Sequence, residues 1–239
     1  MSVPKYPRVL PCGDAAITVE FGDIIDDEVN ARVLALDVAL SEVRLPGVTE
    51  TVPTYRSLLV HYDPIVIGFD ELKARALALA GERRRSNRPT RRWRIPVVYG
   101  AEYGIDLEFI ANNVGLSVDE VVAFHCAGTY RVFMLGFMPG FAYLGGLDPL
   151  IAMPRRREPR QNAPPGTVSI GGIQAAVQSV PGPSGWHWIG RTPLRVYARD
   201  REPMCLLEPG DHVQFFAISA EEWDTYAGRC EQFVEYEVA

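Results

Sequence analysis

The side chains best suited to chemistry in this sequence of 239 residues lie between residues 125 and 192. His125 has a side chain whose ordinary pKa lies near neutrality, so it could take up or release a proton in catalysis. The segment Pro154–Arg160 (PRRREPR) carries four arginines, and a guanidinium group matches a carboxylate or phosphate with two parallel hydrogen bonds. Arg191 and Thr192 follow a tryptophan-rich stretch, and Gln174 follows two glycines. These residue types indicate a site for a polar, anionic ligand.

Each of these features also has a purely structural explanation. A histidine within a helix more often completes the protein interior, and an arginine run more often forms a solvated loop. His125 and Cys126 are adjacent, but neighbours on a helix do not face each other, so they do not form a Cys–His dyad. The sequence leaves both explanations open for His125 and for the arginine cluster.

The most unusual stretch is Gly136–Asp148, which reads GFMPGFAYLGGLD. Its four glycines are interspersed with large apolar and aromatic side chains. This composition disfavours helix and strand, because glycine costs about 0.5–1 kcal/mol in either. Glycines suit a segment where the backbone bends sharply or approaches another group closely. This glycine block therefore marks either an unusual corner of the core or a site. Its place between His125 and the arginine cluster favours one wall of a site, with Phe137, Phe141 and Tyr143 giving the wall its shape.

Several common site motifs are absent from the sequence. It has no GxxxxGK[ST] phosphate-binding loop, no GxGxxG dinucleotide motif and no HExxH zinc motif. Its four cysteines show no metal-binding spacing, so we expect neither a metal site nor a disulfide framework. The net charge of -6 argues against a general nucleic-acid binder. The sequence also lacks a long apolar run and a signal-peptide pattern, so we expect a cytoplasmic protein that does not enter a membrane.

The elements that must position these residues fall into two parts. Residues 1–88 resemble an α/β domain, because apolar residues between Val29 and Val43 recur every three or four positions, as on one face of a helix. A second helical pattern begins at Phe69. The order strand, helix, strand, strand, helix is typical of a ferredoxin-like half-domain. The predicted strands cover residues 15–21, 48–52 and 57–62.

Residues 89–239 are predicted to form a second domain built mainly of strands. An arginine-rich segment over residues 83–94 separates the two parts, and we expect a solvated linker there, with contact to an acidic partner as the alternative. Ser117–Glu120 matches a helix capping box. Apolar residues beyond it alternate at period 2, which predicts a barrel or sandwich. Residues Trp186–Tyr197 alternate between two faces, with a turn predicted at Gly190–Pro193 after the tryptophan-containing strand. Ser219 precedes a predicted short C-terminal helix. The fold class is therefore α+β.

Several long motifs in a fixed order resemble those of one known family. They are PCGDAAITVEFG and VPTYRSLLVHYDP in the first domain, and then the glycine block, GTVSIGGIQ, SGWHWIGRTP and LEPGDHVQF. This order resembles the KipI-like family, also called allophanate hydrolase subunit 1 or the B subunit of the bacterial ATP-dependent 5-oxoprolinase, which is related to carboxyltransferase domains C and D. The resemblance spans residues 8–216. It implies an N-terminal α/β domain, here ferredoxin-like, followed by a cyclophilin-like β-barrel.

The resemblance also implies a function. The chain would be a subunit of an ATP-dependent hydrolase of an amide or lactam such as 5-oxoproline, with ATP bound together with partner subunits. Its site would be shared with a homologous subunit 2 (KipA-like), and a LamB/YcsF-type protein is a candidate third subunit. Two alternatives stay open: a KipI-like inhibitor of a histidine kinase, and a part of a biotin-dependent carboxyltransferase that receives biotin from another protein. No complete catalytic set is visible, so we expect the chain to be inactive alone.

Under this resemblance the candidate residues take specific roles. His125 would act as acid or base, and Tyr143 and Gln174 would orient the substrate. The arginines would hold the substrate carboxylate or a transferred phosphoryl group. The predicted catalytic residues are His125, Tyr143 and Arg160, and the predicted substrate- or anion-binding residues are Arg155, Gln174, Arg191 and Thr192. No metal or biotin site is expected.

The sequence departs from the family in one loop. Gln178 and Ser179 stand where the family usually has Tyr-Pro, and Ser184 stands where it usually has glycine. The loop keeps its length but changes its chemistry, so the exact substrate stays open.

Overall fold

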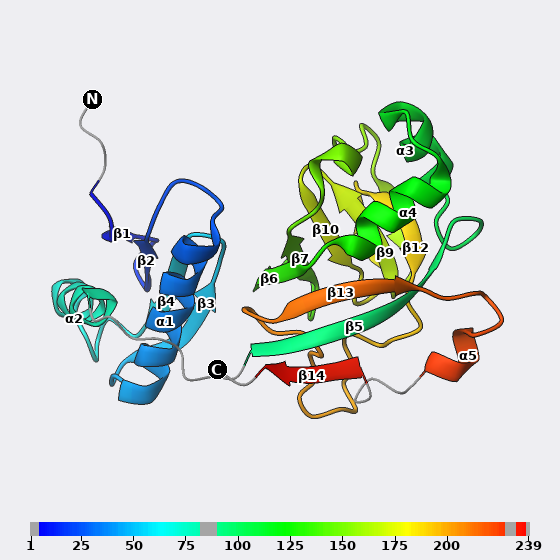
Figure 1. Cartoon of the computed structure of the whole chain (residues 1–239). Helices are drawn as coiled ribbons and strands as arrows, with labels where there is room; N and C mark the ends of the chain where they lie inside the picture. The colour runs from blue at the N-terminus through cyan, green and yellow to red at the C-terminus, as the bar shows by residue number, and fades with distance from the viewer. Residues whose placement is uncertain (1–4, 82–89, 228–232, 238–239) are drawn as a thin grey trace. The chain divides into compact units, whose positions relative to one another are not determined.

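The chain forms two compact units, residues 1–88 and 89–239 (Figure 1). Each unit buries its own apolar side chains in a separate hydrophobic core. Residues 83–89 of the predicted linker lie outside the part of the chain that the structure describes. The computed structural model describes residues 5–81, 90–227 and 233–237.

The N-terminal unit is a four-stranded antiparallel sheet with two helices. Its elements are β1 (Arg8–Pro11), β2 (Ala16–Glu20), α1 (Asp27–Val43), β3 (Val48–Pro53), β4 (Ser57–Tyr62) and α2 (Phe69–Gly81). The strand order is β1-β2-β4-β3. The predicted order of strand, helix, strand, strand, helix is confirmed, and the unpredicted strand β1 pairs with the free edge of β2. The ferredoxin-like assignment stays a prediction.

Local sequence explains where helix α1 begins and ends. The Asp26 carboxylate accepts hydrogen bonds from the backbone N–H groups of Glu28 and Val29, which satisfies two free donors of the first turn. At the other end, Arg44 adopts the left-handed conformation that commonly ends a helix, with φ of 49°. The apolar face predicted from the spacing is buried in the unit, through Val33, Leu36 and Leu40.

The C-terminal unit is built around a closed barrel of seven strands (Figure 1). Its elements are β5 (Thr90–Tyr99), α3 (Leu107–Val114), α4 (Val118–Ala127), β6 (Tyr130–Leu135), β7 (Ala142–Gly145), η1 (Pro149–Ile151), β8 (Arg160–Ala163), β9 (Thr167–Gly171), β10 (Gln174–Val177), β11 (Gly182–Ser184), β12 (His187–Arg191), β13 (His212–Ala217), α5 (Trp223–Tyr226) and β14 (Val234–Glu237). The ring runs β12-β9-β10-β7-β6-β13-β5 and closes where β12 pairs with the C-terminal end of β5. β14 pairs with the N-terminal end of β5, and β8 and β11 form a separate two-stranded sheet. This closed barrel is consistent with the predicted cyclophilin-like barrel.

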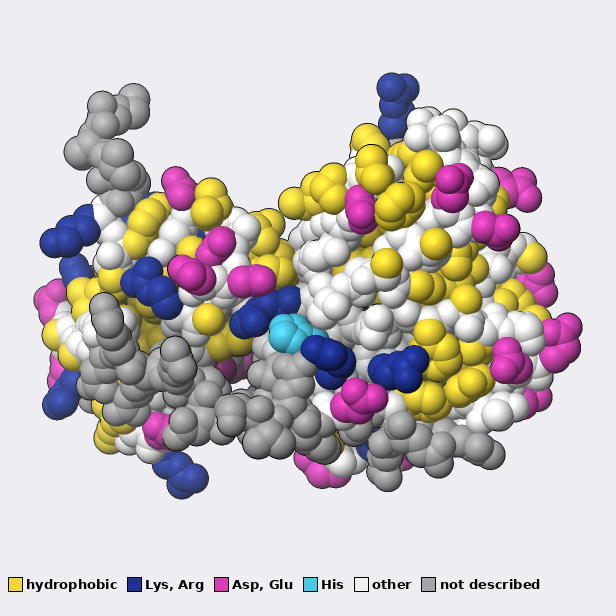
Figure 2. All heavy atoms as spheres, in the orientation of Figure 1, with side chains coloured by type: hydrophobic (Ala, Val, Ile, Leu, Met, Phe, Trp, Pro, Cys, Tyr) yellow, Lys and Arg dark blue, Asp and Glu magenta, His cyan; other side chains and the backbone are white. Residues whose placement is uncertain are grey.

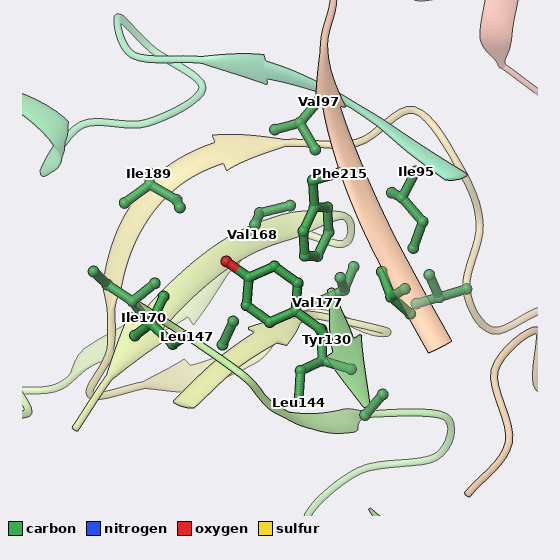
Figure 3. Packing of buried hydrophobic residues seen from close by; sticks show 14 of the residues in the cluster. Ile95, Val97, Tyr130, Leu144, Leu147, Val168, Ile170, Val177, Ile189 and Phe215 are labelled. Carbon is green, nitrogen blue, oxygen red and sulfur yellow. The ribbon is translucent and has the colours of Figure 1, made fainter. Parts of the chain in front are cut away.

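Two aromatic rings occupy the centre of the barrel. Tyr130 and Phe215 are buried, with ring centroids 5.2 Å apart in an edge-to-face contact, and aliphatic side chains from several strands surround them (Figure 3). Ile110 of α3 and Val121 of α4 belong to the same core, so both helices pack onto the barrel. The capping box predicted at Ser117 is present at the start of α4.

Strand β12 ends at Arg191, within the turn predicted at Gly190–Pro193, and the alternation beyond this turn does not continue as a strand of the barrel. The Thr192 backbone N–H donates to the Gly166 carbonyl instead, and Pro193 has no N–H with which to continue a ladder. The predicted alternation of exposure is also missing from β12, whose first four residues are all buried. A loop that begins at Pro154 covers the outer face of this strand, and the Pro154 carbonyl lies 3.0 Å from Nε2 of His187.

The described surface carries charges of both signs. On the face drawn in Figure 2, acidic and basic side chains are interspersed, and hydrophobic side chains gather in patches between them. None of the described helices is long and apolar enough to cross a bilayer.

Candidate functional site

The structure places His125 in the protein interior rather than in an open site. Its side chain is 0% exposed and packs against the rings of Tyr130 and Phe215, with centroids 5.2 and 4.6 Å away. Its Nδ1 shares a hydrogen bond of 2.7 Å with the Tyr99 hydroxyl. Burial lowers the pKa of His125 to about 3, so the ring is neutral at pH 7 and shielded from a substrate. Its position therefore favours the structural explanation over the predicted acid–base role.

The arginine cluster at Pro154–Arg160 contains side chains that hold the loop in place. Arg160 donates to both oxygens of the Asp106 carboxylate at 2.7 Å each, and Arg156 reaches the same carboxylate at 3.3 Å. The Trp188 backbone N–H also donates to Asp106, at 2.8 Å. The Arg160 guanidinium lies 4.6 Å from the centroid of the Trp188 ring. This Asp106 network ties the cluster to β12, so Arg160 is engaged within the protein rather than free to bind a substrate.

The Asp106 carboxylate stays ionised inside this network. The residue is 4% exposed, and burial alone would raise its pKa. Hydrogen bonds from Arg160 and from the Trp188 backbone, together with the charges of Arg160 and Arg156, outweigh burial and hold the pKa of Asp106 below its ordinary value. No local sequence pattern predicts this role, because Asp106 lies 54 positions before Arg160.

Three other predicted residues lie on the same outer face of the barrel. Tyr143 of β7 lies opposite Ala176 of β10, and Gln174 stands two positions from Ala176 on that strand, so it shares this face. Trp186 packs edge-to-face against Tyr143, with ring centroids 6.0 Å apart. The Arg155 guanidinium lies 5.6 Å from the centroid of the Trp186 ring. Tyr143, Arg155, Gln174 and Trp186 are called the outer platform below.

The outer platform combines a phenol, a carboxamide and a cation. Burial raises the pKa of Tyr143 above its ordinary value, although the charge of Arg155 acts in the opposite direction, so the phenol is protonated at pH 7. The exposed Arg155 contacts Trp186 but makes no hydrogen bond or ion pair with the described residues. Such a set can bind a carboxylate through the guanidinium, and a polar amide through the phenol and carboxamide.

The glycine block forms an edge of the outer platform. Its Phe141 packs edge-to-face against Tyr143, with ring centroids 5.0 Å apart. Phe137 has φ of 66° and is 63% exposed, and a left-handed backbone is costly for so large a side chain. Gly140 has φ of 71°, and a Cβ there would lie 2.9 Å from Cβ of Tyr197. The block therefore presents one ring to solvent while its glycine permits close packing against Tyr197.

Met138 joins the glycine block to the loop in which the sequence departs from the family. The Gln178 side-chain nitrogen donates to the Val180 carbonyl at 2.9 Å and lies 3.3 Å from the Met138 sulfur. Gln178 and Ser179 are both buried. A Cβ at Gly182 would lie 2.2 Å from the Met138 methyl group. At Gln178, the departure therefore changes the packing beneath the block.

Arg191 and Thr192 belong to a different feature, a groove of about 500 Å³. Arg191 Nε donates to the Pro165 carbonyl at 3.2 Å, and its guanidinium lies 5.4 Å from the centroid of the Trp223 ring. Thr192 is buried, and its hydroxyl accepts a hydrogen bond from the Leu194 backbone N–H, so Thr192 stabilises the turn after β12. The arginine groove is lined by Arg191, Arg195, Tyr197, Arg199, Trp223 and Ser179, among others.

The structure therefore divides the predicted site residues into three groups. Some lie on the outer platform, one offers its charge to the arginine groove, and the rest support the fold, including Thr192 in the groove wall. Within the described residues, no three His, Cys, Asp or Glu side chains gather in a way that could hold a metal ion. The outer platform contains Tyr143, Arg155 and Gln174, and the charge in the arginine groove is Arg191. The residues that support the fold are His125, Arg160 and Thr192.

Comparison with known proteins relates most of the chain to one family. The family described as "Carboxyltransferase domain, subdomain C and D" matches residues 7–207. The B subunit of 5-oxoprolinase from Bacillus subtilis is 39% identical over 227 residues, which cover 90% of this chain and 94% of the relative. Its namesake from Escherichia coli O157:H7 is 37% identical, over 85% of this chain and 92% of the relative.

Solved structures share the fold. TTHA0988 is 35% identical with a TM-score of 0.78 over 86% of this chain, and this chain spans 40% of the length of that protein. PH0987 from Pyrococcus horikoshii, described as a conserved uncharacterized protein, is 41% identical with a TM-score of 0.54 over 90% of this chain and 100% of that one. The Kluyveromyces lactis urea carboxylase has a TM-score of 0.76 over 96% of this chain and 24% of that one, but at 20% identity it supports the fold alone.

Proposed function

The chain belongs to the family of the carboxyltransferase domain, subdomains C and D, and we propose that it is one subunit of an ATP-dependent hydrolase of amide or lactam bonds. The relatives that match nearly their full length are named as B subunits of 5-oxoprolinase. Those names support 5-oxoproline, a small lactam with one carboxylate, as the substrate. The observation that carries the proposal is the outer platform, which offers an exposed cation beside a phenol and a carboxamide.

On this proposal the outer platform binds the substrate at two ends. Arg155 pairs with the carboxylate, and Tyr143 and Gln174 hydrogen-bond to the polar atoms of the lactam ring. ATP is a co-substrate, and transfer of its terminal phosphoryl group to the lactam oxygen activates the ring carbon toward water. Arg160 and Thr192, which were predicted to contact substrate, instead act indirectly by holding their loops.

The proposal includes a partner, because the outer platform contains no group suited to act as a base near neutral pH. His125 is buried away from it. The naming of the relatives as subunits supports a multi-subunit enzyme. We propose that a homologous subunit 2 (KipA-like) completes the site and that ATP binds together with the partner, with a LamB/YcsF-type protein as the third subunit. The ferredoxin-like assignment and the cytoplasmic location remain predictions.

The test is co-expression with the neighbouring genes, followed by purification and measurement of ADP release. We expect a stable complex whose ATP turnover depends on 5-oxoproline, and no turnover by this chain alone. Arg155→Gln should raise the KM for 5-oxoproline about tenfold or more, because a charged hydrogen-bond donor is lost. Arg157→Gln is the matched control, since Arg157 is an exposed arginine of the same cluster. A complex that turns over ATP equally with and without any lactam or ureido acid would contradict the proposal.

A second candidate function has support from the family description itself. That description names a carboxyltransferase domain, which favours carboxyl transfer from biotin supplied by another protein. The same purified complex would distinguish the two functions. Carboxylation of a substrate that requires a biotin-carrying partner would favour the carboxyltransferase, whereas ADP release without biotin would favour the hydrolase.

A further inference from the structure

We propose that the arginine groove binds a small molecule that carries a carboxylate or phosphate group on a flat, mainly apolar body. The groove measures about 500 Å³, which is within the usual range for small-molecule sites. It is formed by residues that follow β12, by the turn at Pro165 and by Trp223 at the start of α5. The proposed hydrolase reaction uses the outer platform and does not require this groove, so the two proposals are independent.

The walls of the groove are rigid and largely apolar. Pro165, Pro181 and Pro193 line it, and each proline fixes its own φ angle. Tyr197 and Trp223 add two aromatic side chains to the lining. A preformed wall of this kind loses little conformational entropy when a ligand binds, and its flat rings and prolines suit a flat apolar body.

The charges in the groove are mostly positive and partly unpaired. Arg191 is held in place by the Pro165 carbonyl and the Trp223 ring, and its two terminal nitrogens have no hydrogen-bond partner among the described residues. Arg199 is exposed and likewise makes no hydrogen bond or ion pair within the described part of the chain. Arg195 and Asp200 form an exposed ion pair at 3.0 Å, so one carboxylate faces three arginines. This balance favours an anionic ligand.

A buried polar atom on the same wall supports a ligand site. Ser179 lines the groove and is 6% exposed. Its hydroxyl oxygen has no hydrogen-bond partner among the described residues, although buried polar atoms normally have one. A ligand that reaches this wall can supply the missing partner.

Calorimetric titration and tryptophan fluorescence of the intact chain test the proposal. The probes are ATP, in which phosphates are carried on a flat body, benzoate, in which a carboxylate is carried on one, and inorganic phosphate, which lacks the body. We expect ATP or benzoate to bind more tightly than inorganic phosphate. Arg191→Gln and Arg199→Gln should each weaken that binding about tenfold. Arg157→Gln, which changes an exposed arginine outside the groove lining, should leave it unchanged.

The outcomes separate the ligand classes. Binding of ATP without benzoate assigns the groove to phosphates, and the reverse result assigns it to carboxylates. Absence of binding by both probes overturns the proposal, as does binding that is unaffected in both groove variants or weakened equally by Arg157→Gln. The melting temperature of Arg199→Gln provides a folding control, because Arg199 makes no hydrogen bond within the described residues and its loss should leave the fold intact. ADP release by the multi-subunit complex is measured separately, so failure of the hydrolase proposal leaves this test standing.

Discussion

At the scale of single residues, one buried carboxylate organises much of the outer face of the barrel. Asp106 accepts hydrogen bonds from Arg160, Arg156 and the Trp188 backbone. Two arginines of the PRRREPR cluster are thereby fixed, and their loop carries Arg155 to the ring of Trp186. The position of the exposed Arg155 guanidinium therefore depends on the buried Asp106 carboxylate.

Replacing Asp106 with asparagine should strongly destabilise the barrel. The substitution leaves two largely buried guanidinium groups without their counter-ion, and breaking such a network typically costs about 3 kcal/mol or more. Urea unfolding of Asp106→Asn and of the wild type measures the difference. Asp200→Asn is the control, because the Arg195–Asp200 pair is exposed and should contribute little. Equal stability of Asp106→Asn and the wild type would contradict this account.

The stability difference between the wild type and Asp106→Asn should also depend on pH. Because the pKa of Asp106 is held below its ordinary value, its stabilising effect is fully present above the unfolded-state pKa of about 4 and is lost as the pH falls through the folded-state pKa. The stability difference between the wild type and Asp106→Asn should therefore be constant near neutrality and shrink below about pH 4. Unfolding measured in urea across this range checks the trend, and a difference that widened on acidification would refute it.

Burial of His125 should make the stability of the protein depend on pH in a different, less acidic range. Burial lowers its folded-state pKa to about 3, whereas in the unfolded chain it protonates near pH 6.5. The unfolded state therefore binds the extra proton first, and stability should fall as the pH drops below about 6.5, by up to about 1.4 kcal/mol per pH unit. In His125→Gln this part of the slope should disappear. Identical slopes in the two proteins between pH 6.5 and 4 would show that the ring protonates without leaving the interior.

At the scale of elements, barrel closure depends on a glycine. Gly190 of β12 pairs with Tyr99 of β5. A Cβ at Gly190 would lie 2.6 Å both from a Val97 methyl group and from the Val98 carbonyl oxygen. Since a backbone atom of the facing strand cannot rotate away, the strands would have to separate.

Gly190→Ala should therefore lower the stability of the barrel by about 2 kcal/mol, in the range expected for overpacking. The measurement is urea unfolding, together with hydrogen exchange of the backbone amides in β12 and β5, which should become faster at the closing pair. Gly185→Ala is the matched control, because its nearest contact would be at an ordinary 3.8 Å, to Pro159. A Gly190→Ala protein as stable as Gly185→Ala would mean that the closing strands can shift at little cost.

Sequence patterns predicted elements better than they predicted sites. The spacing of Val33, Leu36 and Leu40 predicted helix α1, and its buried face is confirmed. We predicted a site role for His125 because it precedes the glycine block. Val121 and His125 are one helical turn apart, and both are buried. Helical spacing alone therefore indicates that His125 faces the core. Asp106 could not be predicted, because its partners are distant in sequence. The alternation over Leu194–Tyr197 does not form a barrel strand, because an alternating pattern carries no information about the backbone donor that the preceding Pro193 lacks.

At the scale of the whole molecule, the chain contains two cores that share no residue. Leu58, which is 0% exposed, belongs to the N-terminal core. Leu58→Ala should destabilise the N-terminal unit by about 3 kcal/mol, and in a double variant with Asp106→Asn the two effects should add. Unfolding followed by hydrogen exchange in each unit provides the measurement. A loss of protection in the barrel caused by Leu58→Ala would show that the two units unfold as one.

The position of β5 in the ring of strands has a consequence for synthesis of the protein. β5 ends at Tyr99, whereas the strands that pair with it begin at His187, His212 and Val234. On the ribosome, β5 therefore emerges long before its partners exist, and its backbone donors and acceptors remain unpaired until most of the chain has been made. The last described element of the N-terminal unit, α2, ends at Gly81, so this unit can fold while translation continues. We expect the nascent barrel to be the stage of biogenesis most exposed to aggregation and most in need of a chaperone.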